Sequence, residues 1–375
     1  MVDHYLYHTG TWIYSQLCNL QSWQALVLCR DTMNLEDFPW PHICSLDRLF
    51  APRAWLNRAA NRGLGCYPDH LLAARRRGVR LLHAHFGPHG VDSLTLARWL
   101  GVPLITNFYG FDVSLLPRQP GWQERYDRLF GQGALFLVEG PHMRAQVIGL
   151  GCPPGKVRVR RLGIDPQRFR FQERRPQDRG EPVRVLVVGT FTEKKGIPDA
   201  LRALAAARRQ GAALRMTLVG DASGPAGDPA IAAEVERLIA ELDLGQVVTR
   251  TGAIPHERLI EEYHRHQLML APSVQAASGD NEGGAPVTIT EAAATGLPVV
   301  ATRHCDIPEV VRHEESGLLA EERDVETLAG HLLLLAQHPE RWPAMGRAAR
   351  ARVEAEFDAR RTTAQLEQLY DEVAA

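Results

Sequence analysis

Strand-like apolar runs alternate with helix-like segments along nearly the whole chain, and Gly or Pro stands at the joints. In the first half, the expected strands are residues 24–29, 79–86, 103–109, 134–139 and 157–163. In the second half they are residues 183–191, 215–221, 246–252, 267–273 and 297–302, with helices expected at 197–209, 232–243 and 256–265. Such alternation is typical of parallel sheets with helices on both faces, so the sequence predicts a doubly wound α/β fold.

The alternation is interrupted once, at residues 169–183, where the chain is polar and carries Pro176, Gly180 and Pro182. A chain of 375 residues is also longer than one hydrophobic core usually organises. We therefore expect two Rossmann-like domains, over residues 1–175 and 176–355. Ligands of such sheets bind beyond the carboxyl ends of the strands, so the expected site is a cleft between two facing domains.

Composition narrows the class of protein. A hydrophobic content of 45% and a charged content of 23% are typical of a soluble globular chain. No apolar run reaches the length of a membrane span, and the first residues lack the basic and apolar regions of a secretion signal. The six cysteines contain no C-x-x-C pair, which favours reduced thiols over disulfides or zinc. The expected location is therefore the cytoplasm.

The formal net charge of -1 hides a basic front half and an acidic back half. One interpretation is that the solvated faces simply differ. The other is that the front half works beside an anionic surface, and Arg75, Arg76 and Arg77 would then rest on anionic lipid at the inner membrane. Nucleic acid is a less suitable partner because no basic stripe is interleaved with aromatic residues.

The first candidate site is VLVVGTFTEKKG at residues 185–196. A buried strand ends at Gly189, and Lys194, Lys195 and Gly196 lead into the next helix. Backbone N–H groups at a helix start, with a lysine nearby, suit a diphosphate. The spacing is neither that of a Walker loop nor that of a dinucleotide-binding turn, and two surface lysines after a strand are the alternative reading.

The second candidate site is NEGGAPVTITEA at residues 281–292. Pro286 suits the first position of a helix running to Thr295, with Gly296 as its stop. The side chain of Glu291 would lean back toward that helix start, where it could accept from a ribose diol. Glu282 in the preceding loop could accept from hydroxyls of a second ring. Either glutamate taken alone is more often a solvated or capping residue.

The third candidate site lies in the front half, where HAHFGPHG (83–90) and TNFYGFDVS (106–114) each end a strand. Histidine, tyrosine and aspartate at strand ends are well placed to touch a polar substrate. For His83 and His85, imidazoles hydrogen-bonded within the strand are more probable than a metal site, because no third ligand has suitable spacing.

In combination these motifs resemble the retaining family 4 glycosyltransferases of two-domain GT-B architecture, specifically those of bacterial exopolysaccharide assembly of the colanic-acid type. The likeness covers nearly the whole chain, and the ordered set is far more specific than any single motif. It lies in residues 83–90, 109–114, 150–169 (LGCPPGKVRVRRLGIDPQRF), 187–196, 251–263 (TGAIPHERLIEEY) and 282–302 (EGGAPVTITEAAATGLPVVAT).

The resemblance implies a hexosyltransferase whose UDP- or GDP-sugar donor is held mainly by the second domain and whose glycan or polyprenyl-linked acceptor is held by the first. Lys195 would hold the diphosphate, Glu291 the ribose, and the loop containing Ile254 the base. No metal or other cofactor is implied, since lysine and helix N-termini take its place. The resemblance also implies a C-terminal helix, at about 356–375, that packs back onto the first domain. The residues implied as catalytic are Glu282, Tyr109 and His85; the other donor ligands are Gly189, Thr190, Lys194, Gly283, Gly284, Ala285, Pro286 and Val287; the acceptor side comprises Gly10, His83 and Asp112.

The chain departs from the family pattern at four places. Thr190 replaces the usual arginine, Tyr109 replaces the usual histidine, and eight residues separate Glu282 from Glu291 where seven are usual. Only residues 1–7 are left to form the opening strand. These departures sustain two alternatives: a nucleotide-sugar-binding protein with little activity in a glycan-assembly complex, and, with less support, a GT-B-like sugar-nucleotide epimerase.

Overall fold

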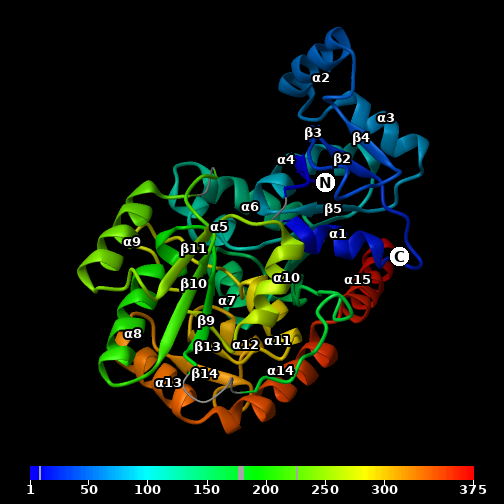
Figure 1. The fold of residues 1–375 in the computed structure, drawn as a ribbon. Helices are drawn as coiled ribbons and strands as arrows, with labels where there is room; N and C mark the ends of the chain where they lie inside the picture. Colours follow the sequence, from blue (N-terminus) through cyan, green and yellow to red (C-terminus); the bar gives the residue numbers. More distant parts are fainter. Residues whose placement is uncertain (8–9, 176–180, 225–226) are drawn as a thin grey trace. The chain divides into compact units, whose positions relative to one another are not determined.

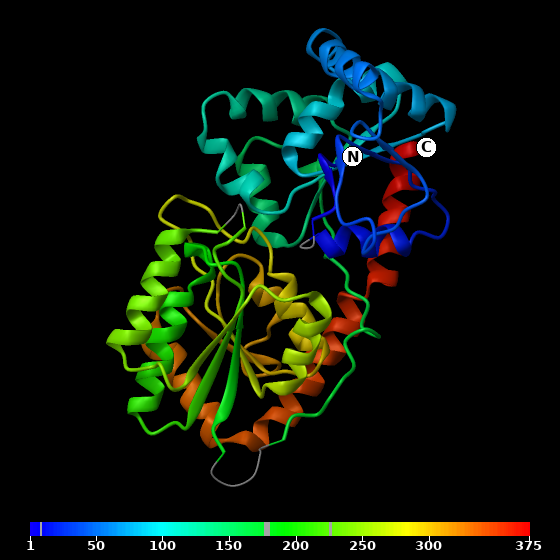
Figure 2. The same cartoon turned by 45° about the horizontal axis from the view of Figure 1, so that its top comes forward.

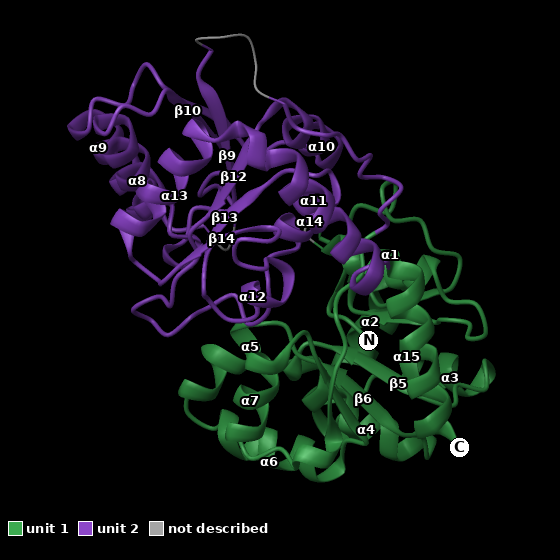
Figure 3. Ribbon diagram, turned by 90° about the horizontal axis from the view of Figure 1, so that it is seen from below, with its two compact units in different colours: residues 1–164, 359–375 green, residues 165–358 purple. Residues whose placement is uncertain are grey.

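The computed structural model describes residues 1–7, 10–175, 181–224 and 227–375. These residues form two compact units, one made of residues 1–164 with 359–375 and the other of residues 165–358 (Figure 3). Both units carry parallel sheets and helices, which is the mixed α/β arrangement that the alternation of apolar runs predicts. The middle of the expected linker, residues 176–180, lies outside the described residues.

The first unit ends earlier in the chain than the predicted boundary at residue 175, because the segment after Ile164 is attached to the second unit. The backbone N–H of Gln172 donates to the Thr295 carbonyl (3.0 Å). The buried Arg174 guanidinium donates to the carbonyls of Tyr263 (2.6 Å) and His266 (3.0 Å). These bonds cap the C-terminal ends of the helices at residues 256–265 and 287–294, so a charged stretch that reads as a linker is partly structural.

The second unit is a six-stranded parallel sheet with helices on both sides (Figure 1). The strand order is β11-β10-β9-β12-β13-β14, so the two strands at the centre, β9 and β12, are not consecutive in the chain. A doubly wound dinucleotide-binding sheet has this order: the chain adds strands toward one edge of the sheet, returns to the centre, and then adds strands toward the other edge. The strands are β9 (Val183–Val188), β10 (Leu214–Val219), β11 (Val248–Gly252), β12 (Leu268–Ala271), β13 (Val299–Thr302) and β14 (Gly317–Ala320). The helices are α8 (Ile197–Arg209), α9 (Pro229–Glu241), α10 (His256–Arg265), α11 (Val287–Ala294), α12 (Ile307–Val310), α13 (Val325–Gln337) and α14 (Trp342–Glu356), with short 3-10 turns η4 (Glu193–Lys195) and η5 (Pro339–Arg341).

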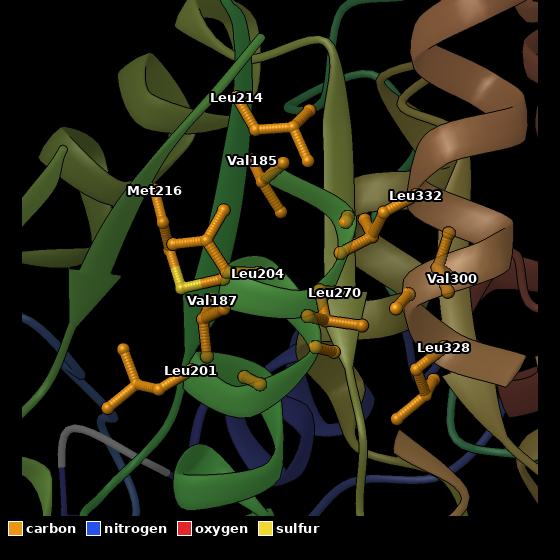
Figure 4. Packing of buried hydrophobic residues seen from close by; sticks show 14 of the residues in the cluster. Val185, Val187, Leu201, Leu204, Leu214, Met216, Leu270, Val300, Leu328 and Leu332 are labelled. Carbon is orange, nitrogen blue, oxygen red and sulfur yellow. The ribbon is translucent and has the colours of Figure 1, made fainter. Parts of the chain in front are cut away.

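The core of this unit fills the space between the sheet and helices α8, α9 and α13. Figure 4 shows Val185 and Val187 of β9 facing Leu201 and Leu204 of α8, with Leu328 and Leu332 of α13 beside them. The central strands are buried on both faces, which explains why their sequences are continuous apolar runs rather than alternating ones. A rigid sheet of this kind fixes the loops at its carboxyl edge.

The first unit contains a four-stranded parallel sheet, in the order β5-β6-β7-β8, and two shorter parallel pairs, β2-β4 and β1-β3. Residues 1–2 connect these pieces, since the His85 N–H donates to the Met1 carbonyl (3.0 Å) and the Val2 N–H to the Leu28 carbonyl (3.3 Å). The strands are β1 (His4–Tyr5), β2 (Val27–Cys29), β3 (Asp31–Thr32), β4 (Ile43–Ser45), β5 (Leu82–His85), β6 (Leu104–Asn107), β7 (Leu135–Val138) and β8 (Val157–Val159). The helices are α1 (Thr11–Cys18), α2 (Ala51–Leu64), α3 (Pro68–Arg76), α4 (Gly87–Leu100), α5 (Phe111–Ser114), α6 (Trp122–Gln132), α7 (Pro141–Gly149) and α15 (Ala359–Ala374), with 3-10 turns η2 (Leu116–Arg118) and η3 (Pro154–Lys156).

The last helix of the chain, α15, belongs to the first unit, and Figure 2 shows it beside α1. Leu366 and Tyr370 pack against the buried strand residues Ile105 and Leu137. The Glu367 carboxylate accepts from three successive backbone N–H groups, those of residues 21–23. The helix thus covers one face of the first sheet although it is far from that sheet in sequence.

Candidate active site

The donor-side candidates gather at the centre of the second sheet. Strands β9 and β12 are hydrogen-bonded neighbours, and the loops that leave them, residues 189–196 and 272–286, both start at the carboxyl edge of the sheet. From β9 the chain continues to β10 and β11 on one side of the sheet, and from β12 it continues to β13 and β14 on the other side. Doubly wound sheets open a crevice for a ligand between the two strands where the direction of winding changes. Sequence reasoning selected both loops, and the strand order explains why they meet.

The loop after β9 brings Lys195 back over the strand end. Gly196 has φ +62°, and a Cβ there would lie 1.8 Å from the Pro272 carbonyl oxygen, so only glycine allows the two loops to touch. A Cβ on Gly189 would lie 3.1 Å from Cγ and Cδ of Lys195. The lysine stem therefore lies across Gly189, and its ammonium group reaches the β12 loop. Thr190 follows Gly189 and is half-buried.

Lys195 and Glu282 form a close ion pair. The ammonium nitrogen lies 2.9 Å from each carboxylate oxygen, and the Ser273 hydroxyl donates to the same carboxylate (3.0 Å). Burial by itself would raise the pKa of Glu282, but the charges of Lys195 and Lys194 outweigh burial and lower this pKa. Glu282, with a side chain only 7% exposed, is therefore an ionised group held in place by its counter-ion.

Lys194 has a different set of partners. Its ammonium group lies 3.0 Å from Asp280 Oδ2 and donates to the Asn281 carbonyl (3.2 Å). These contacts fasten the loop before Glu282, and the Asn281 side chain in turn accepts from the Gly283 N–H (2.9 Å). Gly283 has φ +74°, and this turn places Glu282 against Lys195. The stretch between the two glutamates thus begins with a tight turn.

Helix α11 starts one residue later than predicted. Pro286 is its N-cap, with extended ψ of 129°, and the helix runs from Val287 to Ala294. Thr295 is the C-cap, and Gly296 follows with φ +79°, as the sequence predicts for a helix stop. The first N–H groups of a helix precede its ladder of hydrogen bonds, so this end carries partial positive charge and can receive an anion, although the Ile289 N–H already donates to the Pro286 carbonyl (2.9 Å). Gly284, Ala285 and Pro286 lead the backbone into that end.

Glu291 is buried and held by two side chains of α10. Its Oε1 lies 2.9 Å from His256 Nε2, and its Oε2 accepts from the Tyr263 hydroxyl (2.8 Å). Burial, followed by the Glu291 charge, raises the pKa of Tyr263 well above its usual value, so the phenol stays a donor. Ile254 is half-buried in the loop between β11 and α10. His256 and Tyr263 were missed by sequence reasoning, although a seven-residue separation on a helix puts both on one face.

A second pair that sequence reasoning missed supports the loop of Glu282. His304 Nε2 accepts from the Glu282 backbone N–H (3.2 Å), so the proton is on Nδ1, which donates to Glu322 (2.6 Å). Cys305 follows with φ +46°, and its sulfur lies 3.2 Å from His304 Nε2. The signal is weak in sequence, since RHCD after a strand is an ordinary polar turn. These contacts hold the backbone of Glu282 in place.

The front-half candidates meet at the carboxyl end of β5 and β6. The rings of His83 and His85 stack at 4.5 Å, and His85 Nδ1 is hydrogen-bonded to the Tyr109 hydroxyl (2.5 Å). His83 Nε2 contacts Asn107 Oδ1 (2.8 Å), and His83 Nδ1 contacts the Tyr370 hydroxyl (2.5 Å). Burial lowers the pKa of His83 to about 3 and that of His85 well below 6.5. Both imidazoles are neutral and hydrogen-bonded within the fold, as the sequence favours.

The Asp112 side chain binds backbone N–H groups, and Gly10 lies at a helix start. The Asp112 carboxylate accepts from the N–H groups of Gly87 (2.9 Å), Tyr109 (3.0 Å) and Gly110 (2.9 Å). Burial raises its pKa, and the three backbone bonds oppose that shift only in part. Asp112 thus joins the turns after β5 and β6, and its role as an acceptor ligand stays a prediction. Gly10 is buried at the N-cap of α1.

Across the residues that the structure describes, no group of three His, Cys, Asp or Glu side chains is placed to hold a metal ion. In the same residues, no helix has the length and apolar character needed to cross a membrane. The donor-side candidates lie in the second unit, around Lys195, the start of α11, and the two glutamates Glu282 and Glu291. The other candidates come together in the first unit.

Comparison with known proteins agrees with this arrangement. Residues 20–168 match the family described as Glycosyltransferase Family 4, and residues 169–352 match Glycosyl transferases group 1. The chain is 35% identical over 292 residues to the amylovoran biosynthesis glycosyltransferase AmsK of Erwinia amylovora, a match covering 77% of this chain and 69% of the relative. It is 35% identical over 280 residues to the putative colanic acid biosynthesis glycosyltransferase WcaL of Escherichia coli strain K12, covering 73% of this chain and 66% of the relative. The matched stretch thus spans about two thirds of the length of these curated relatives.

Solved structures show the same fold at low identity. The structure of Anabaena Alr3699/HepE in complex with UDP superposes with a TM-score of 0.79 at 18% identity, covering 99% of this chain and 98% of that one. The sucrose-phosphate synthase of Thermosynechococcus elongatus superposes with a TM-score of 0.73 at 21% identity, with coverage of 99% and 98%. The resemblance and the fold predicted from the sequence are confirmed. The chain belongs to the glycosyltransferases that join a family 4 domain to a group 1 domain in the GT-B fold, and it is an enzyme of that class.

Proposed function

We propose that the enzyme moves a hexose, with retention at the anomeric carbon, from a UDP- or GDP-sugar to a growing exopolysaccharide acceptor carried on a lipid. The observation that carries the donor assignment is the Lys195–Glu282 pair at the centre of the second sheet. Lys195 offers a positive charge to a diphosphate, and the start of α11 offers backbone N–H groups. Glu291, buried further along α11, offers a fixed carboxylate to the ribose.

The chemistry expected of these residues is mainly electrostatic. Breaking the bond between sugar and diphosphate develops positive charge on the sugar ring and negative charge on the leaving group. Lys195 and the N–H groups of α11 stabilise the leaving diphosphate, which can itself take the proton from the attacking hydroxyl. Glu282 would orient Lys195 and accept from sugar hydroxyls. On this proposal the positive charge of lysine and helix supplies what a metal ion supplies elsewhere, and transfer is metal-independent.

The exopolysaccharide role rests on the relatives. AmsK is named for amylovoran biosynthesis and WcaL for colanic acid biosynthesis, and both match this chain across both of its domains at 35% identity. The nucleotide-sugar donor is supported by HepE, which has been solved with UDP and with UDP-glucose. A growing bacterial polysaccharide is a suitable acceptor for an enzyme with these likenesses.

A thermal-shift panel of UDP- and GDP-sugars tests the donor assignment. One nucleotide sugar at a hundred times its dissociation constant should add about 2.7 kcal/mol to the free energy of unfolding. A matching nucleotide monophosphate should add much less, because it cannot occupy the diphosphate position. A diphosphate site at Lys195 would be contradicted if the nucleotide monophosphate stabilised the chain as much as the nucleotide sugar. It would also be contradicted if no member of the panel stabilised the chain.

We further propose that α2 contacts anionic lipid, extending the expectation for Arg75–Arg77. Three apolar side chains at the start of α2 are exposed: Phe50 (67%), Trp55 (67%) and Leu56 (59%). The helix carries three arginines and no acidic residue, and the basic end of α3 follows. One of the three, Arg53, is already paired with Asp69 (2.6 Å). Exposed aromatic and leucine side chains among arginines suit the interface of an anionic membrane, where apolar groups insert and cations pair with headgroups.

Replacing Arg75, Arg76 and Arg77 by glutamine should weaken binding to phosphatidylglycerol vesicles by about a hundredfold, at about 1 kcal/mol per arginine near the surface. Vesicle co-sedimentation at several salt concentrations measures this, and the salt dependence should weaken as well. A triple glutamine variant of the exposed Arg209, Arg215 and Arg237 in the second unit is the matched control and should bind like the wild type. Equal binding by both triple variants would remove lipid contact at this surface.

A further inference from the structure

The turns after three neighbouring strands of the second sheet lie beside one another. Strands β12, β13 and β14 are parallel and adjacent, so their carboxyl ends meet at one edge of the sheet. His304 lies two residues after β13, and Glu322 lies two residues after β14. Hydrogen bonds connect both side chains to the loop after β12, residues 272–286, which carries Glu282.

The Glu322 carboxylate joins two separate parts of that loop. Its Oε2 accepts from the Gln275 N–H (2.7 Å), and its Oε1 accepts from His304 Nδ1 (2.6 Å). His304, which is only 1% exposed, uses Nε2 to accept from the Glu282 N–H (3.2 Å). The imidazole thus lies between a carboxylate and a backbone N–H, and these two partners fix its tautomer and its orientation.

Glu282 is held in two different ways. Its carboxylate contacts Lys195 (2.9 Å) and Ser273 (3.0 Å), whereas its backbone N–H donates to His304. On the proposed function a diphosphate pairs with Lys195, so donor binding weakens the contact between Lys195 and the carboxylate. The backbone contact uses no group that the proposed function assigns to the donor, so it can persist when the donor binds. It then determines where the released carboxylate lies.

We propose that His304, oriented by Glu322, is a positioning residue for the sugar end of the donor. It holds the Glu282 backbone so that the carboxylate meets the sugar hydroxyls, and it does not act on the nucleotide end, which Lys195 and Glu291 hold. The inference rests on the proposed function, which places the sugar hydroxyls at Glu282. A displacement of about 1 Å near the reacting atoms can lower a rate by about a hundredfold, so one hydrogen bond behind Glu282 is enough to affect transfer.

Donor cleavage and nucleotide binding, measured on the same variants, test this division. His304→Ala should cleave the best-stabilising UDP- or GDP-sugar about a hundredfold more slowly, while its dissociation constant for the matching nucleoside diphosphate stays unchanged. Glu322→Ala should also slow cleavage, because the imidazole loses the acceptor that orients it. His266→Ala is the matched control and should cleave at the wild-type rate. That histidine is also buried between two partners, the Glu262 carbonyl (2.7 Å) and the Thr217 hydroxyl (2.8 Å).

Two further replacements separate the contacts of His304. A glutamine side chain ends near the position of Nε2, so its carbonyl can accept from the Glu282 N–H. An asparagine side chain ends near the position of Nδ1, so its amide can donate to Glu322 only. His304→Gln should therefore recover most of the cleavage rate, and His304→Asn should not. Equal recovery by the two variants, or recovery by neither, would overturn the proposal.

A double-mutant cycle with Glu282 distinguishes positioning from a structural role. A Glu282→Ala chain has no carboxylate to position, so adding His304→Ala to it should leave its cleavage rate unchanged. A purely structural His304 would instead lower the rate by the same factor in both backgrounds and would weaken binding of the nucleoside diphosphate. Either of these two results would overturn the proposal.

The outcome is separable from that of the donor assignment. If the wild type cleaves a UDP- or GDP-sugar and His304→Ala cleaves it equally fast, the positioning inference fails alone. If the wild type neither binds nor cleaves any nucleotide sugar, the proposed function fails, and the inference falls with it.

Discussion

Replacing Lys195 with methionine is expected to lower sugar transfer by about a hundredfold or more and to destabilise the second unit. The activity falls because the leaving diphosphate loses the cation that Lys195 supplies, and single preorganised donors of this kind contribute about a hundredfold to a thousandfold. Stability falls because Glu282 is left buried and ionised without its counter-ion, at a cost of about 2 to 3 kcal/mol. Urea unfolding and a donor-cleavage assay measure the two effects.

The double variant Lys195→Met, Glu282→Gln separates stability from chemistry. Removing both charges should restore most of the lost free energy of unfolding, since a neutral amide needs no counter-ion. Transfer should stay low, because the cation is still absent. If the double variant recovers activity together with stability, the lysine acts only as a structural partner of Glu282.

The same ion pair makes a pH prediction. The pKa of Glu282 in the folded chain lies below its usual 4.5, so the pair stabilises the fold fully above pH 4.5. That contribution should be lost as the pH falls through the lowered pKa, since the unfolded chain then binds a proton that the folded chain does not. In the double variant this part of the acid dependence of unfolding should disappear.

Glu291→Gln is the second change with a large expected effect. A carboxylate that accepts from two ribose hydroxyls becomes an amide, and a hydrogen bond to a charged group is worth about 1.5 to 3 kcal/mol. The donor KM should therefore rise by about tenfold to a hundredfold, while kcat changes less. The Gln side chain fills the same space between His256 and Tyr263, so folding should be preserved.

A deoxyribose analogue of the donor sharpens this test. The wild type should bind a 2′-deoxy or 3′-deoxy nucleotide sugar about tenfold or more weakly than the natural donor, and Glu291→Gln should bind both alike. Tyr263→Phe is the matched control, because it removes one hydrogen bond to Glu291 while leaving the carboxylate. It should keep the discrimination between ribose and deoxyribose. Discrimination retained in Glu291→Gln would assign the ribose to another residue.

The sequence was most informative where periodicity and local chemistry act together. Helices α8 and α10 occupy the predicted residues 197–209 and 256–265, and each strand of the second sheet that was predicted is present at or within its expected range to within one residue. Apolar runs bounded by Gly and Pro carry enough local information for this. The sequence also indicates the tight loop at Gly196, since a strand followed by Lys-Lys-Gly is typical of one.

Partners far apart in the chain were not predictable. His256 and Tyr263 meet Glu291 only because α10 packs beside α11, and His304 meets the Glu282 backbone only because β13 lies beside β12. The first unit's stretch from Met1 ends at Ile164, before the expected boundary at residue 175, because Arg174 donates to a carbonyl at the end of α10 and to one after α11. A single sequence does not show which of many polar side chains will face each other after folding.

The anomeric configuration of the sugar released from the donor tests the central claim most directly. The purified enzyme is incubated with the UDP- or GDP-sugar that stabilises it best, and the first product is followed by proton NMR before mutarotation. Our account predicts cleavage with retention, without added metal, and its loss in Lys195→Met. Cleavage with inversion, or retention at wild-type rate in Lys195→Met, would contradict it.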